Sequence, residues 1–139
     1  MSVSADSTPR QAARPCHTYD YAIIRVVPRV DRGEQMNVGI ILSCVDSDFL
    51  DIRIALDETR LRALDLTADL ESVHAGLTTL KAVCAGGPEA GPVGELPPRA
   101  RFRWMVSPRS TVVQTSPVHT GRTDNPQAAL QHLFETMVL

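Results

Sequence analysis

Two apolar runs joined by a charged loop constrain this fold more than any other stretch of the chain. The first run, residues 19–28, alternates between two faces, which is the period of a half-buried or fully buried β-strand. Pro28 ends the pattern because it has no N–H group to donate to a ladder. The second run, residues 38–42, is rich in β-branched side chains and brings the chain back. The pair predicts two strands with a polar loop between them.

A third alternating run and two helical patterns follow. Residues 49–55 alternate after a turn-rich break, so the first three strands should form an antiparallel meander. Asp57 is predicted to be the N-cap of a short helix that follows it. Between residues 66 and 84 an apolar side chain recurs every three or four positions, which predicts a long amphipathic helix. This helix should be capped by Thr67 and should end at Gly86.

The rest of the chain repeats this order of elements. Residues 101–106 alternate between two faces and residues 111–115 form another short run, so two more strands are predicted. Asn125 and Pro126 mark the N-cap and the first position of a C-terminal helix. The order β-β-β-α-β-β-α predicts an α+β fold, in which two main helices pack on one face of an antiparallel sheet of about five strands.

Composition separates a tail from one domain. Residues 1–17 are small and polar and show no periodicity, so we expect a disordered N-terminal tail. Residues 18–139 form the predicted single α+β domain, whose length is enough to bury a core. Within this domain, residues 86–98 are rich in Gly, Pro, Glu and Ala and predict a flexible loop.

Charge and cysteine content argue against several classes of function. The formal net charge of −2 makes nucleic-acid binding an unfavoured function, since such proteins carry a basic excess. Cys16, Cys44 and Cys84 lack the spacing of a zinc site, and we expect no metal and no cofactor. No apolar run reaches the length of a membrane span, and no signal-peptide core is present, which favours a cytoplasmic protein.

The loop between the first two strands carries a dense group of ionic side chains. Arg29, Arg32 and Glu34 surround a glycine, and Asn37 lies at the return into the second strand. Polar loops on a rigid scaffold commonly carry function. We therefore expect this loop to be a contact surface.

Arginines elsewhere in the chain suggest a cationic patch. Guanidinium groups suit the bidentate binding of carboxylate or phosphate. If the strand at 101–106 neighbours the first strand, a patch would form from Arg25, Arg29, Arg101, Arg103 and Arg109. The alternative is that the arginines pair internally with Asp20, Glu34 and Asp51.

His119 is the best single candidate for chemistry. It lies in a loop bounded by proline and glycine, beside Thr120 and near three serines, where a general base and hydroxyls could meet. Ligand binding and hydrogen bonds that pin the loop are the alternatives. No nucleophile-elbow sequence is present, so no catalytic set is predicted. Trp104, the sole tryptophan, is expected in the core.

Five segments in a fixed order carry a family resemblance. They are YDYAIIRVVP (19–28), GEQMNVGIIL (33–42), RFRW (101–104), SPRST (107–111) and SPVHTG (116–121). Together they resemble the bacterial domain-of-unknown-function 3037 family from about residue 19 to 138. The resemblance implies a stand-alone domain that is often encoded beside a HipA-like serine/threonine kinase of toxin type. It implies no catalytic residues, because the family has no established activity.

Two functional hypotheses follow. The first is a non-enzymatic interaction or accessory module whose partner, as the resemblance suggests, is a HipA-like kinase. Its contact surface would be the loop from Arg29 to Asn37 together with the arginine-bearing strand edge. The second is an enzyme or sensor that binds a phosphorylated or anionic small molecule through Arg25, Arg103, Arg109 and His119. The sequence favours the first and leaves the oligomeric state open.

Overall fold

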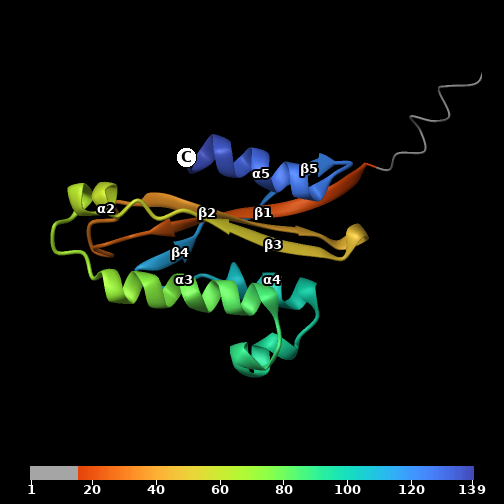
Figure 1. The fold of residues 1–139 in the computed structure, drawn as a ribbon, viewed down its shortest axis with the longest axis horizontal. Coiled ribbons are helices and arrows are strands. Elements are labelled where there is room, and N and C mark those ends of the chain that lie inside the picture. The colour runs from red at the N-terminus through yellow and green to blue at the C-terminus, as the bar shows by residue number, and fades with distance from the viewer. Residues whose placement is uncertain (1–15) are drawn as a thin grey trace, which may run out of the picture.

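The computed structural model describes residues 16–139 as one antiparallel sheet with helices (Figure 1). The strands are β1 (His17–Val26), β2 (Met36–Cys44), β3 (Phe49–Ile54), β4 (Val113–Thr115) and β5 (His119–Thr123). The helices are α2 (Glu58–Leu64), α3 (Leu70–Ala85), α4 (Pro98–Met105) and α5 (Pro126–Met137), with 3₁₀ helices η2 (Val45–Ser47) and η3 (Pro88–Glu95). The predicted α+β class and antiparallel sheet are confirmed.

Strand β1 is paired along both of its edges. The sheet order is β3-β2-β1-β4, and β5 pairs with the first half of β1 where β4 pairs with the second. Between β4 and β5 the chain kinks at Ser116 and Pro117. The Ser116 N–H donates to Ile23 O (2.8 Å), and the Ser116 Oγ accepts from the Ile23 N–H (2.9 Å). A side-chain hydroxyl thus takes the place of a backbone carbonyl where the ladder is interrupted.

A β-bulge lies where β1 and β2 meet Gly39. Ile24 pairs with Gly39 but Arg25 pairs with Asn37, so Val38 is the extra residue of β2. A Cβ atom at Gly39 would lie 2.6 Å from the backbone oxygen of Arg53 on β3. The neighbouring strand therefore approaches too closely for any other residue.

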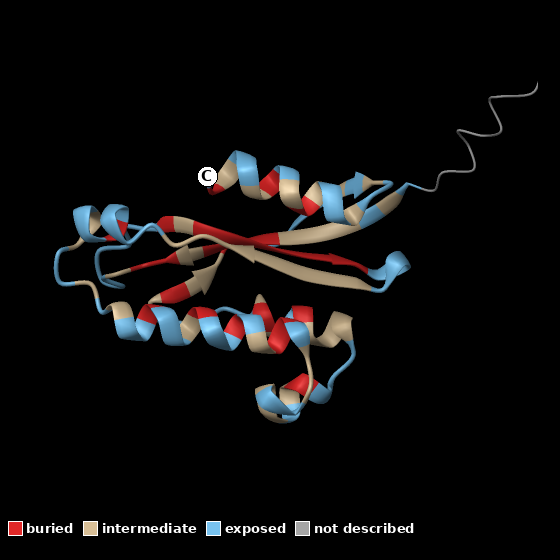
Figure 2. Cartoon of the chain, viewed as in Figure 1, coloured by how far each residue is buried: buried red, intermediate tan, exposed pale blue. Residues whose placement is uncertain are grey.

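Both faces of the sheet are covered by helices. On one face α3 and α4 bury a cluster that includes Ile24, Val38 and Phe102. On the opposite face α5 buries Ile23 and Leu130 in a separate cluster (Figures 1 and 2). The prediction that both main helices pack on one face is therefore wrong. The physical reason is that β1 and β2 are apolar on both of their faces, so each face needs a cover.

The predicted strand at 101–106 is also wrong, because these residues lie in α4 and the turn after it. Phe102 and Met105, three positions apart, are its buried residues, and Pro98 occupies the first helical turn. The fifth strand is instead β5, which contains the residues expected as a loop around His119. Residues 86–98, expected to have no helix, contain η3 and the first residue of α4.

Helix starts were predicted with mixed success. Asp57 caps α2 and Asn125 caps α5, as the sequence predicts, each accepting a hydrogen bond from a backbone N–H three residues on. Helix α3 is capped by Asp69 rather than Thr67. Residues 1–15 of the expected tail lie outside the described residues, so the tail stays a prediction.

Candidate functional site

The loop between β1 and β2 is an exposed ionic hairpin. The backbone N–H groups of Arg32 and Gly33 both donate to Arg29 O, which closes a tight turn. Gly33 has a φ of 76°, a conformation that favours glycine. Residues 29–35 are all exposed, and the Val30 side chain at the tip is 48% exposed.

The connector between α2 and α3 lies beside this loop (Figure 1). Hydrogen bonds from the side chain and the backbone N–H of Thr67 lower the pKa of the Asp65 carboxyl, and the charges of Arg29 and Arg32 lower it further. Leu66 in the same connector is 87% exposed, more than any other large apolar side chain among residues 16–139. We call residues 29–34 and 65–67 the hairpin surface.

Ion pairs within the hairpin surface are open to solvent. Arg32 Nη2 lies 3.2 Å from Glu34 Oε2, and Arg29 Nε lies 3.9 Å from Asp31 Oδ1. Exposed pairs of this kind contribute about 0–1 kcal/mol to stability. The two arginines are therefore free to exchange these carboxylates for those of a partner.

Arg25 and Asn37 perform a structural task away from this surface. Arg25 Nε donates to Asn37 Oδ1 (3.4 Å), and Asn37 Nδ2 donates to Met137 O (3.1 Å). Asn37 therefore satisfies a carbonyl in the last turn of α5 and pins that turn to the sheet.

The other three arginines of the expected cationic patch lie on or after α4 and not on a strand beside β1, so the arrangement on which that patch depended is absent. Arg103 is exposed on the helix. Arg101 donates to Leu96 O and Cys84 O, which holds together the two ends of the segment between α3 and α4. The Arg109 guanidinium stacks over the Trp104 ring at 4.6 Å and donates to Trp104 O (2.7 Å). The suggested internal pairs do not form either: among the described residues Asp20, Glu34 and Asp51 pair with other arginines, namely Arg99, Arg32 and Arg53.

His119 is an exposed residue of β5. Its ring centroid lies 5.3 Å from that of Tyr21 on β1, the residue that it faces across the ladder. No hydrogen bond joins it to a hydroxyl in the part of the chain described here. The Ser116 hydroxyl is committed to Ile23 and Pro117, and the Ser107 hydroxyl donates to Arg103 O.

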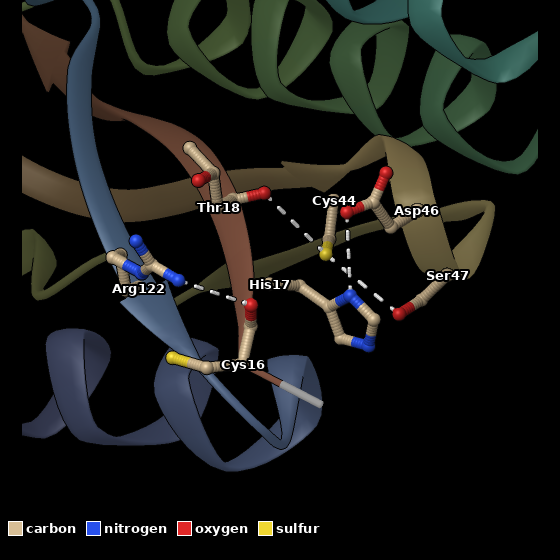
Figure 3. A network of polar contacts seen from close by, with 7 residues as sticks. All are labelled: Cys16, His17, Thr18, Cys44, Asp46, Ser47 and Arg122. Carbon is tan, nitrogen blue, oxygen red and sulfur yellow. Dashed lines mark hydrogen bonds and ion pairs between the residues drawn. The ribbon is translucent and has the colours of Figure 1, made fainter. Parts of the chain in front are cut away.

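A cysteine, a histidine and an aspartate meet at one end of the sheet (Figure 3). His17 Nδ1 lies 3.3 Å from Asp46 Oδ2. The buried Cys44 thiol contacts Thr18 O (3.6 Å) and the Ser47 Oγ (3.7 Å), while the second ring nitrogen of His17 points away from it. Without a histidine nitrogen on the sulfur, the trio lacks the geometry of an activated thiol.

A partly buried ion pair was not predicted from the sequence. Arg99 on α4 donates from Nη2 to Asp20 Oδ2 (2.7 Å) and from Nη1 to the Ser43 Oγ (3.1 Å). The other oxygen of Asp20 accepts from the Thr120 hydroxyl (2.8 Å). The signal was a lone carboxylate within an apolar strand, which requires a partner. That partner could not be chosen without knowing that residues 98–105 are helical.

Neither a metal-binding cluster nor a membrane-spanning helix is found among the described residues. No group of three or more His, Cys, Asp and Glu side chains between residues 16 and 139 is placed to hold a metal ion. No helix in that range is long and apolar enough to cross a membrane.

Comparisons with known proteins leave the family as the one assignment. No curated protein and no solved structure matches the chain. A family model described as "Protein of unknown function (DUF3037)" matches residues 21–138, in agreement with the resemblance carried by the five segments. The match spans nearly the whole chain, which therefore belongs to the DUF3037 family.

Proposed function

We propose that this protein is a non-enzymatic interaction module and that the hairpin surface is its contact with a partner protein. The observation that carries the proposal is the exposure of Leu66 (87%) and Val30 (48%) beside solvent-open ion pairs. Apolar side chains flanked by charged groups are typical of the core and rim of an interface. The surface offers an apolar anchor together with two arginines for acidic groups.

The second hypothesis, an enzyme or sensor that binds an anionic small molecule through Arg25, Arg103, Arg109 and His119 together, has less support. Arg25 binds Asn37 near the end of α5, Arg109 stacks on Trp104, and His119 lies on β5. Among the described residues each of these groups contacts a different partner, and no hydrogen bond, ion pair or ring contact joins them to one another. A general base and an anion clamp must surround the same ligand atoms to act together.

A HipA-like kinase is the first partner to test, because the family resemblance suggests one. An accessory protein of this kind would bind the kinase without catalysing a reaction itself. The hairpin surface would then place Leu66 in an apolar pocket of the kinase and the two arginines against its acidic side chains.

The test is affinity purification of the tagged full chain from its native host, followed by native mass spectrometry. We expect a stoichiometric protein partner, and a lone chain would overturn the interaction-module proposal. Binding of that partner is then measured for Arg29→Glu/Arg32→Glu and for Leu66→Ser.

The charge-matched control is Lys81→Glu/Arg122→Glu, which reverses two exposed charges outside the hairpin surface. We expect the hairpin variants to weaken partner binding at least tenfold, about 1.4 kcal/mol, and the control to weaken it far less. Equal effects of both charge reversals would show that net charge, and not this surface, governs binding.

A further inference from the structure

A groove runs along α3 on its side towards β4 and the segment after α4. Three adjoining cavities of about 500, 370 and 370 Å³ make up the groove. The largest shares Gly76 and Val113 with the second and Thr79 and Trp104 with the third. Sites for small molecules commonly have volumes of about 300–1,000 Å³. None of these lining residues belongs to the hairpin surface.

Arg109 is the one charged side chain that lines the largest cavity. Its stacking on Trp104 and its hydrogen bond to Trp104 O hold the guanidinium in place. No carboxylate among residues 16–139 forms an ion pair with it. Burial lowers the pKa of the Arg109 guanidinium, which reports lost hydration that no protein anion offsets.

The three side-chain hydroxyls of the largest cavity are poor donors for an anion, because their hydrogens are already committed. The hydroxyls of Ser107, Thr111 and Thr79 donate to the backbone oxygens of Arg103, Val113 and Ala75. Arg109 therefore supplies the only positive charge on this lining, and the indole N–H of Trp104 is the one other side-chain donor without an acceptor among the described residues. A single guanidinium matches the one negative charge of a monocarboxylate, whereas a phosphate dianion would keep a second charge unpaired here.

We propose that this groove binds a small amphipathic carboxylate, with the carboxylate on Arg109 and the apolar body along Trp104 and Val113. The apolar lining and the one fixed, unpaired cation supply these two parts of the recognition. The site is separate from the hairpin surface, so a result that contradicts the proposed partner contact does not contradict this carboxylate site.

Trp104 makes the proposal directly measurable, because it is the only tryptophan in the sequence. The full chain is titrated with 3-phenylpropionate, hexanoate, 3-phenylpropionamide and phenyl phosphate while the tryptophan fluorescence is recorded. We expect saturable changes with the two carboxylates and at least tenfold weaker binding of the uncharged amide, since it loses a charge-assisted pair. Phenyl phosphate should bind no more tightly than 3-phenylpropionate.

Two groove variants test separately how the charge of Arg109 and the open volume of the groove contribute to carboxylate binding. Arg109→Gln should weaken carboxylate binding at least tenfold, and Arg122→Gln, an exposed arginine outside the groove, should leave it unchanged. Thr79→Phe keeps Arg109 but fills the cavity, so it should also abolish binding, and thermal melts verify that each variant is folded. Three results would each overturn the proposal: equal binding of acid and amide, full binding by folded Thr79→Phe, or no saturation by either carboxylate up to about 10 mM.

Discussion

Replacing Ser116 by Ala removes the hydroxyl that completes the hydrogen-bond ladder between β1 and the kinked β4–β5 edge. Ser116 is 3% exposed and Ile23 is 8% exposed, so water cannot replace the lost acceptor. The Ile23 N–H, which donates to the Ser116 Oγ at 2.9 Å, would be left buried without a partner. The Pro117 carbonyl also loses a donor, but Pro117 is exposed and its oxygen can bind water.

The size of the effect follows from this difference in burial. A buried backbone donor left unsatisfied costs about 1–3 kcal/mol, while the exposed carbonyl adds little. We expect Ser116→Ala to lower the free energy of unfolding by about 2 kcal/mol. For a domain of this length that loss corresponds to a melting temperature lower by about 6–10 °C.

The assay is urea denaturation followed by circular dichroism, with hydrogen exchange at the Ile23 amide as a local probe. Ser107→Ala is the matched control, because its hydroxyl also donates to a backbone oxygen (2.9 Å) but is exposed. We expect the control to change stability by less than about 0.5 kcal/mol. Protection of the Ile23 amide should fall only in Ser116→Ala.

Two results would refute this reasoning. One is a stability difference of less than about 0.5 kcal/mol between the two serine variants. The other is a large loss of stability in Ser116→Ala with unchanged protection of the Ile23 amide, which would place the damage elsewhere.

Three further predictions test the core. Leu130→Ala should cost about 2–5 kcal/mol in urea denaturation, because this fully buried side chain joins α5 to the sheet; a loss below about 1 kcal/mol would contradict that packing. Gly39→Ala should lower the free energy of unfolding by about 1–3 kcal/mol, since its Cβ would meet Arg53 O at 2.6 Å; unchanged stability would contradict the close approach of β3. Burial raises the pKa of the Cys84 thiol from 9.0 to about 12, so the unfolded chain loses this proton first. The free energy of unfolding should therefore fall between pH 9 and about 12, less steeply in Cys84→Ala, and equal slopes would count against the shift.

The parts of the fold that were predicted correctly depend on local patterns. The strand at 19–28 was identified because alternation and Pro28 act within one segment. Asp57 and Asn125 were identified as caps because each bonds a backbone N–H only three residues away.

The parts that were missed depend on contacts between distant segments. The short apolar pattern of residues 101–106 fits a strand as well as it fits the observed helix. The burial of Phe102 and Met105, which are three positions apart, identifies the helix, and this burial is known only from the structure. The consecutive apolar residues of β1 indicate that both of its faces are buried, but they do not say which helix covers which face.

The candidate sites likewise divide into a part that local sequence predicts and a part that depends on the three-dimensional structure. The hairpin loop was predicted as an ionic contact surface, since its charges lie within six residues of sequence, 29–34. Leu66 was expected at the start of the apolar stripe of the long helix, but α3 begins only at Leu70 and Leu66 is exposed. The stacking of Arg109 on Trp104 was not predicted, because residues 101–106 were expected to form a strand.

The two-sided pairing of β1 also sets the order in which the chain can fold. The meander β1–β2–β3 joins consecutive segments and closes quickly, whereas Ile23 must find Ser116 across 93 positions of sequence. Until that late step, the apolar β1 exposes a free strand edge, to which another chain can add as readily as β4 and β5. We therefore expect refolding yield to fall with rising protein concentration, because association competes with the closing step for the same edge.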